Sequence, residues 1–178
     1  MPSKKWSGLN HMQLGQFGEY YAKMEFASYG FDVYTSEVDD HGVDFIARDI
    51  KTGIFYEVQV KSMFKGKYVF IKKDKLVMDD RHLVCFLHFI ENELPEIYVI
   101  PATAWETPNA VLVDRNYVKP EWGINFSNKN QALLEKYDQN VFSKIVTVQS
   151  QAKFHKPDVK CEAFWRLALN SYRKLNNV

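Results

Sequence analysis

The amino-acid sequence has few cysteines, no long apolar run and almost no net charge. Its two cysteines, Cys85 and Cys161, are too few and too far apart to indicate a metal knuckle or a disulfide framework. The longest apolar run, around residues 83–90, is far shorter than the ~20 residues that span a bilayer. No apolar stretch follows Lys4 and Lys5, so no signal peptide is expected. We therefore expect a cytoplasmic protein that does not interact with membranes.

Charge is balanced along the chain as a whole. The 23 lysines and arginines against 22 acids give a net charge of +1, so any nucleic-acid-binding surface must be local. Apolar residues make up 46% and charged residues 25% of the 178 residues, which is typical of a globular domain with a core. A single domain over residues 1–178 is expected.

Apolar spacing predicts one helix, then a run of strands, then further helices. Helical periodicity covers about residues 13–29, and Gly30 follows where a helix ends. The other expected elements are strands at about 31–35, 43–48, 54–63, 68–72, 83–90, 96–100 and 111–113, a short helix at 101–105, and helices at about 129–146 and 159–175. This order is typical of an α+β or mixed α/β domain.

One predicted hairpin carries an unusual polar face. The turn at residues 49–53 joins its strands and places Asp44 opposite Gln59. Because alternate residues of a strand share a face, Glu57 and Lys61 lie beside this pair, and the valines between them point into a core. Carboxylate and amide oxygens suit Mg²⁺ or Mn²⁺, and a neighbouring lysine can orient or deprotonate a water or stabilise phosphate charge.

The same pattern also fits an exposed face without chemistry. On an antiparallel sheet that is wet on one side, Asp44 or Glu57 would form a salt bridge with Lys61. Spacing alone therefore leaves the metal site and the salt-bridged face open.

Two short motifs resemble a known nuclease family. The segment Gly42-Val43-Asp44-Phe45, followed by Glu57-Val58-Gln59-Val60-Lys61-Ser62, resembles the core of the PD-(D/E)xK nuclease superfamily. The segment Gly18-Glu19-Tyr20-Tyr21-Ala22 resembles the first helix of archaeal Holliday-junction resolvases. The resemblance implies a restriction-endonuclease-like fold: a mixed central sheet with an N-terminal helix and C-terminal helices. We expect the nuclease-like core at about residues 13–106 and a C-terminal helical extension at about 125–178.

The resemblance also implies roles for individual residues. Asp44 would be the principal metal ligand, Gln59 the second ligand, Lys61 the catalytic lysine, and Glu19 an accessory ligand from the helix. The four together would form the catalytic set, with Mg²⁺ or Mn²⁺ as cofactor.

Gln59 departs from the family pattern, which usually has an acid at this place. An amide oxygen can bind a hard cation but brings no negative charge, so the site would hold a metal less tightly and a second metal becomes doubtful. Glu57 could supply the missing charge or form a salt bridge at the rim of the site. His41, in the loop before Asp44, could contact the scissile phosphate, although capping a turn is the favoured interpretation.

A basic segment follows the polar strand. Its six lysines, opposed by Asp74, give a local charge of +5: Lys61, Lys65, Lys67, Lys72, Lys73 and Lys75. Lys65, Lys67, Lys72 and Lys73 are the expected nucleic-acid contacts, and a lysine-protected edge strand is the alternative. Among the tryptophans, Trp122, expected in a loop, is a better stacking candidate than Trp105, and Trp165 is expected in a core.

These observations favour an enzyme: a metal-dependent endonuclease that hydrolyses phosphodiester bonds in DNA with a one-metal site. RNA is left open as a substrate, and a homodimer is allowed. One alternative is a catalytically weak or inactive nucleic-acid-binding module on the same fold. Another is a protein-interaction protein of the inhibitor or immunity type.

Overall fold

The computed structural model describes residues 3–35 and 42–138, which lie in one compact unit spanning residues 1–147. His41, Trp165, the helix expected at 159–175 and residues 139–146 of the helix expected at 129–146 lie outside the described residues. The single-domain organisation of the whole chain and its division into core and extension therefore stay predictions. No described helix combines the length and the apolar character needed to cross a membrane.

The N-terminal helix, α1, runs from His11 to Ser28 and has a well-defined start. The side chain of Asn10 accepts a hydrogen bond from the backbone N–H of Gln13 at 2.9 Å, and the Gln13 side chain accepts one from Asn10 N–H at 3.0 Å. This reciprocal pair is a capping box, which satisfies N–H groups that the first helical turn leaves unpaired. A short 3-10 turn, η1 (Trp6–Gly8), precedes the helix.

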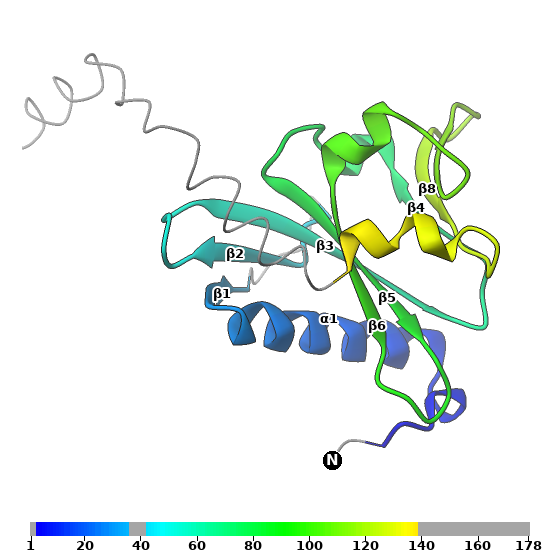
Figure 1. Cartoon of the computed structure of the whole chain (residues 1–178), viewed down its shortest axis with the longest axis horizontal. Coiled ribbons are helices and arrows are strands. Elements are labelled where there is room, and N and C mark those ends of the chain that lie inside the picture. The colour runs from blue at the N-terminus through cyan, green and yellow to red at the C-terminus, as the bar shows by residue number, and fades with distance from the viewer. Residues whose placement is uncertain (1–2, 36–41, 139–178) are drawn as a thin grey trace, which may run out of the picture. The chain divides into compact units, whose positions relative to one another are not determined.

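Five strands form the main sheet, in the order β1-β2-β3-β5-β6 (Figure 1). Their bounds are Phe31–Tyr34 (β1), Phe45–Asp49 (β2), Phe55–Phe64 (β3), His82–Phe89 (β5) and Glu96–Pro101 (β6). The pairs are antiparallel except for β3 and β5, which are parallel. The predicted mixed central sheet with an N-terminal helix is therefore confirmed.

A tight turn joins β2 to β3. The buried side chain of Asp49 accepts hydrogen bonds from Lys51 N–H at 2.9 Å and from the Thr52 hydroxyl at 2.7 Å. Gly53 adopts a φ of 73°, a left-handed conformation that favours glycine. This local chemistry fixes the hairpin and with it the register of the two strands.

Three strands form a second sheet, in the order β4-β8-β7. They are β4 (Tyr68–Lys72), β7 (Leu112–Arg115) and β8 (Glu121–Asn125), all paired antiparallel. The prediction of a loop around Trp122 is wrong, because this residue lies within β8. The strand is stabilised by pairing with β4, which is about fifty residues earlier in the chain, and no local pattern in the sequence indicates that partner.

The main sheet has an apolar core on each face. On one face, α1 covers buried residues such as Phe45, Val58 and Val60. On the other, β5 and β6 pack with the second sheet, and Trp105 is buried there, donating its indole N–H to the carbonyl of Gly123 at 3.1 Å. Trp105 is therefore a core residue and does not present its ring for base stacking.

The remaining described elements are short 3-10 turns: η2 (Lys73–Lys75), η3 (Ala102–Glu106), η4 (Gln131–Leu133) and η5 (Glu135–Tyr137). The α-helix expected from residue 129 does not form over the described part of its range. Asn130 is buried and its side chain donates to the carbonyls of Asn125 and Ala110, at 2.6 and 3.1 Å. These bonds hold the backbone in a turn where helical spacing predicted a continuous helix.

Candidate functional site

The polar face of the β2–β3 hairpin has the register predicted from the sequence. Phe45 lies opposite Val58 and Ile46 opposite Glu57, and the same register continued by one residue places Asp44 opposite Gln59. The backbone N–H of Asp44 donates to the carbonyl of Val58 at 2.9 Å. Asp44 and Gln59 therefore share the face of the sheet that is turned away from α1.

The carboxylate of Asp44 ends the pairing between β2 and β3. Its Oδ2 accepts the backbone N–H of Val60 at 2.5 Å, in the place where a further residue of β2 would have paired. Beyond this point β3 continues to Phe64 with β5 along one edge only. The hydrogen bond orients the carboxylate, and a carboxylate has enough lone pairs to bind a cation at the same time.

Gln59 contributes a buried acceptor beside this carboxylate. Its side chain is 8% exposed, and its Oε1 has no hydrogen-bond partner among the described residues. A buried polar atom without a partner is unfavourable, and binding of a cation would satisfy it. Gly42, with a φ of 80°, packs against the amide, since a Cβ at Gly42 would lie 3.0 Å from Gln59 Nε2. The carboxylate and amide oxygens together fit a hard divalent cation.

Lys61 follows Gln59 on the same face of β3. It is half-buried and lines a hollow of about 270 Å³ together with His11 and Gly15 of α1 and Phe70 of β4. The structure thus brings the predicted lysine to the open stretch of β3, next to the Asp44–Gln59 pair.

Glu19 is half-buried on α1, and Nε2 of Gln16 lies 3.4 Å from its carboxylate. Gly15, one turn earlier on the helix, lines the hollow with Lys61. Phe26, two turns later, packs against Phe45 on the α1 side of the sheet, with ring centroids 5.2 Å apart. Over residues 3–35 and 42–138, no three histidine, cysteine, aspartate or glutamate side chains are grouped to hold a metal. The role of Glu19 as an accessory ligand stays a prediction.

Glu57 is engaged at the edge of the site rather than in its centre. Its carboxylate is 3.1 Å from Nε2 of His82, and its side chain is 48% exposed. His82 Nδ1 is in turn 2.7 Å from Asp79. Burial by itself would raise the pKa of Asp79, but hydrogen bonds from His82 and from the backbone N–H of Arg81 lower it on balance. Glu57 thus has a partner at the rim of the site, and whether it supplies charge to a metal stays a prediction.

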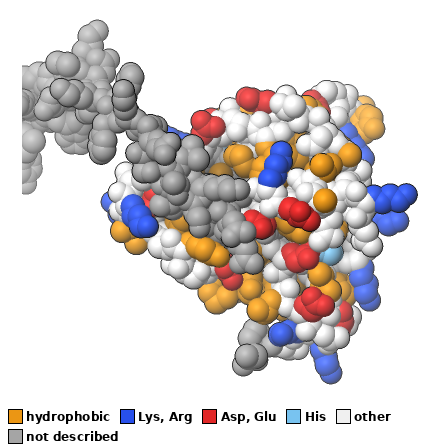
Figure 2. All heavy atoms as spheres, viewed as in Figure 1, with side chains coloured by type: hydrophobic (Ala, Val, Ile, Leu, Met, Phe, Trp, Pro, Cys, Tyr) orange, Lys and Arg blue, Asp and Glu red, His pale blue; other side chains and the backbone are white. Residues whose placement is uncertain are grey.

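The predicted nucleic-acid-binding lysines divide into two groups. Lys65, Lys67 and Lys72 are exposed. Lys73 instead contacts Asp114 at 2.5 Å and its ammonium lies 3.8 Å from the centroid of the Trp122 ring. Figure 2 shows acidic side chains near the middle of one face, with lysine and arginine side chains chiefly at its margin. The exposed positive charge of this segment is therefore a local feature of a chain whose net charge is only +1.

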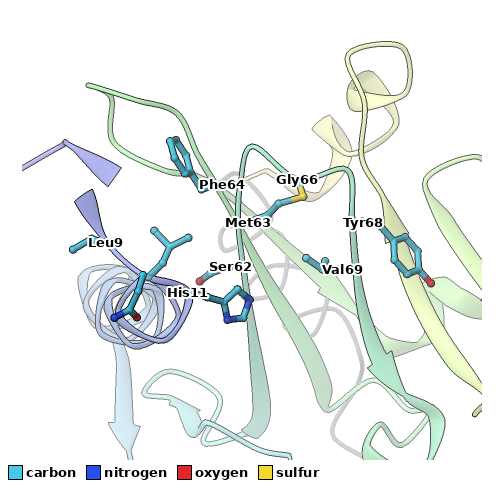
Figure 3. A pocket seen from close by; sticks show the side chains of 10 residues that line it. Leu9, His11, Ser62, Met63, Phe64, Gly66, Tyr68 and Val69 are labelled. Atoms are coloured by element: carbon cyan, nitrogen blue, oxygen red, sulfur yellow. The ribbon is translucent and has the colours of Figure 1, made fainter. Parts of the chain in front are cut away.

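A groove lies between α1, the open stretch of β3, and β4 (Figure 3). Figure 3 shows His11 on the end-on helix, Ser62 and Met63 on β3, and Val69 on β4, around a hollow of about 320 Å³. This hollow adjoins the one that Lys61 lines, because the two share His11, Ser62, Tyr68 and Val69. The sequence analysis missed this groove, since its walls come from three elements far apart in the chain.

Glycine lets α1 approach β3 closely at the floor of the groove. A Cβ at Gly18 would collide with Oγ of Ser62, whereas one at Gly15 would meet no atom within 4 Å. Ser62 Oγ is itself buried without a hydrogen-bond partner among the described residues. The Gly15 and Gly18 pair inside an otherwise regular helix was the signal from which this contact could have been found.

Cys85 plays no part in the site. It is fully buried in β5, and burial together with the negative charges of Glu25 and Asp44 raises the pKa of its thiol. A buried thiol held in its neutral form is a packing residue and not a nucleophile.

Two solved nuclease structures are similar to this chain. One is the bacterial homing endonuclease I-Ssp6803I, with 18% identity and a TM-score of 0.51 over 81% of this chain and 97% of that one. The other is Hjc, a Holliday junction resolvase of Archaeoglobus fulgidus, with 14% identity and a TM-score of 0.43 over 62% and 83%. No family model and no curated protein matches the sequence. The chain therefore has a restriction-endonuclease-like fold, as its motifs predicted.

Proposed function

We propose that the protein is a metal-dependent endonuclease that hydrolyses phosphodiester bonds in DNA. The observation that carries this proposal is the buried, unpartnered Oε1 of Gln59, which shares a face with the Asp44 carboxylate and with Lys61. These three groups lie where β3 leaves β2 and its edge opens to a groove. A cation ligand pair beside a lysine in a groove is the arrangement that phosphodiester hydrolysis needs.

Each residue has a distinct role in this proposal. Asp44 and Gln59 would hold Mg²⁺ or Mn²⁺, with Glu19 approaching from α1. When bound, the ion would supply Lewis-acid polarisation of a phosphoryl oxygen. Lys61 orients or deprotonates the attacking water, or offsets negative charge that develops on the phosphate. The hydrogen bond from Val60 N–H holds the Asp44 carboxylate in position throughout.

The surroundings of the site favour a nucleic-acid substrate. Lys65, Lys67 and Lys72 are exposed near the groove and would neutralise backbone phosphates, so binding should weaken as salt is raised. The fold shared with a homing endonuclease supports DNA over RNA. A homodimer would present one such site to each strand of a duplex. We place the protein in the cytoplasm, where its buried Cys85 would stay reduced.

Cleavage assays on supercoiled plasmid and on branched DNA test the proposal. Nicking should require Mg²⁺ or Mn²⁺ and stop in EDTA. Asp44→Ala and Lys61→Ala should each lower the rate by about 10²–10³. Asp80→Ala and Lys51→Ala replace exposed residues of the same types outside the site and should cleave as wild type does. Metal-independent nicking, or full activity in the Asp44 and Lys61 variants, overturns the proposal.

A second candidate function is a binding module without cleavage. Gln59 favours it, because an amide brings no charge to the metal site. The lack of a three-ligand His, Cys or acid group in the described residues points the same way. Calorimetric titration with Mn²⁺, combined with DNA binding in EDTA, separates the two functions. Tight DNA binding that is indifferent to the metal and to Asp44→Ala establishes the binding module.

A further inference from the structure

We infer that Phe70 is a stacking platform for an unpaired nucleobase next to the scissile phosphate, an inference that rests on the proposed function. Phe70 lies in β4 and is 49% exposed. It lines the same hollow of about 270 Å³ as Lys61. An exposed aromatic ring therefore lies beside the lysine proposed to act on the phosphate, and this arrangement indicates the class of substrate.

The alternation of side chains along β4 explains why the ring is exposed. Val69 and Ile71 pack into the core between the two sheets. Tyr68, Phe70 and Lys72 therefore turn to the other face of the strand. Within the described part of the chain, Phe70 belongs to neither apolar core cluster. Its ring is thus not needed to complete a core.

Tyr68, the neighbouring aromatic on this face, also lines the hollow, but its ring and hydroxyl are engaged by other residues. A Cβ at Gly123 would collide with the Tyr68 ring, so this ring lies against the backbone of β8. Its hydroxyl donates to Glu121 at 2.7 Å, and the guanidinium of Arg115 lies 4.0 Å from its centroid. Of the two aromatic residues, Phe70 is therefore the one that can receive a base. Its partner across the strand pair is Gly123, over which the Tyr68 ring lies.

The charges around Phe70 favour a nucleic-acid strand over an apolar protein partner. Lys72 lies two residues away on the same face, and Lys67 precedes the strand, both exposed. Lysines that neutralise a phosphate backbone beside an aromatic ring that stacks on bases are typical of single-strand binding. In this arrangement the lysine-rich segment binds the backbone of the single strand whose base stacks on Phe70, in addition to attracting nucleic acid by its charge.

Stacking on Phe70 restricts the state of the substrate. In a paired duplex both faces of each base are covered by its neighbours, so the ring can receive only a base that is unpaired or turned out. The hollow, at about 270 Å³, is smaller than the ~300–1,000 Å³ pockets of drug-sized ligands and suits one base. The substrate class is therefore DNA with unpaired nucleotides at the cleavage point, such as a branch, a flap or a single strand.

Binding of a single-stranded oligothymidine, compared with an abasic strand of the same length and charge, tests this inference. Fluorescence anisotropy in EDTA measures both dissociation constants without cleavage. Base stacking should make the wild type bind the thymidine strand about 5- to 150-fold more tightly. Phe70→Ala and Phe70→Leu should bring this ratio close to one, and Phe70→Trp should keep it.

Phe55→Ala is the matched control. Phe55 is a strand phenylalanine with 51% exposure that does not line the hollow, so this variant should keep the wild-type ratio. Circular dichroism tests whether each variant is folded. If Phe70→Ala does not fold, Phe70→Leu takes its place in the comparison. A wild-type ratio near one overturns the inference. An unchanged ratio in the Phe70 variants, or an equal loss in Phe55→Ala, does so as well.

These outcomes are separable from failure of the proposed function. If the protein cleaves plasmid in a metal-dependent way but binds the thymidine and abasic strands equally, only the inference about Phe70 is wrong and the proposed function stands. If the protein prefers the thymidine strand but cleaves no DNA at any metal concentration, the proposed endonuclease activity is wrong and the protein is a single-strand-binding module. Failure to bind either strand at low salt removes both.

Discussion

The two halves of β3 differ in what lies along their edges. Residues 55–58 pair with β2 on one side, and β5 runs along the other side from residue 57. From residue 60 to residue 64 only β5 continues, and the opposite edge meets the Asp44 carboxylate and then the groove. The doubly paired half holds the fold together. The half with one open edge has backbone and side chains available for a ligand, and the candidate site lies at the boundary between them.

The largest effect on stability should come from the paired half. Phe45→Ala removes a fully buried ring that lies opposite Val58 and packs against Phe26. It should lower the free energy of unfolding by about 3–5 kcal/mol, measured by urea denaturation. Phe55→Ala, which truncates an exposed ring on the same hairpin, should cost less than about 1 kcal/mol. Equal losses in the two variants would mean that this half does not carry the core.

In the open half, the contact between α1 and β3 depends on Gly18. Gly18→Ala should destabilise by about 1–3 kcal/mol, because its Cβ would collide with Ser62 Oγ. Alanine is otherwise the better helix former by about 1 kcal/mol, so Gly15→Ala, which meets no neighbouring atom, should be neutral or stabilising. Thermal and urea unfolding measure both changes.

A double-mutant cycle sharpens this result. Ser62→Ala removes the colliding Oγ, which has no hydrogen-bond partner among the described residues, and should itself cost little. Adding Ser62→Ala to Gly18→Ala should therefore recover most of the lost stability. If the two losses simply add, the close approach of helix and strand is not what glycine at this position provides.

The features of β3 that could be predicted from the sequence are those set by residues close together in the chain. Asp49 and Gly53 form a short turn, which sets the register, and the register places Asp44 opposite Gln59. Strand alternation then fixed the face of Lys61. All of this lies within about twenty residues of chain, where spacing and geometry determine position directly.

The groove and the second sheet could not be predicted in the same way. Trp122 belongs to a strand only because β4 pairs with it, and Phe70 reaches Lys61 only through the packing of β4 beside β3. The helix expected from residue 129 gives way to turns because Asn130 binds two distant carbonyls. Contacts between remote segments override local propensity at each of these places.

At the boundary of the two halves, metal affinity should depend on one charge. Gln59→Glu replaces the unpartnered amide oxygen by a carboxylate opposite Asp44, and should tighten Mn²⁺ binding about tenfold, or about 1.4 kcal/mol. Without metal, the two facing carboxylates repel, so the pKa of one should rise and the metal-free protein should lose stability. Isothermal titration calorimetry measures the affinity.

Glu57→Gln is the matched control for Gln59→Glu. The Glu57 carboxylate is exposed and paired with His82, so its loss should leave Mn²⁺ affinity unchanged. A loss of affinity in this variant would show that Glu57 supplies the charge that Gln59 lacks. Unchanged affinity in Gln59→Glu would mean that the Asp44–Gln59 pair does not bind the ion.

The smallest effect should come from the far end of the paired half, where β5 begins. The Asp79 carboxylate accepts the backbone N–H groups of Arg81 at 2.8 Å and His82 at 3.0 Å. Burial opposes ionisation, but these bonds and the His82 ring lower the pKa of Asp79 below its ordinary value of 3.8. Asp79→Asn should therefore cost about 1 kcal/mol at neutral pH.

The sign of the pH dependence follows from the lowered pKa of Asp79. Its stabilising contribution is complete above the ordinary pKa of the carboxyl and is lost as the pH falls through the folded-state value. The difference in unfolding free energy between wild type and Asp79→Asn should therefore shrink in acid. Asp80→Asn, at the exposed neighbouring residue, should show no such change. If the difference in unfolding free energy between wild type and Asp79→Asn stays constant into acid, the charge of Asp79 does not contribute to stability. The start of β5 would then be held by backbone pairing alone.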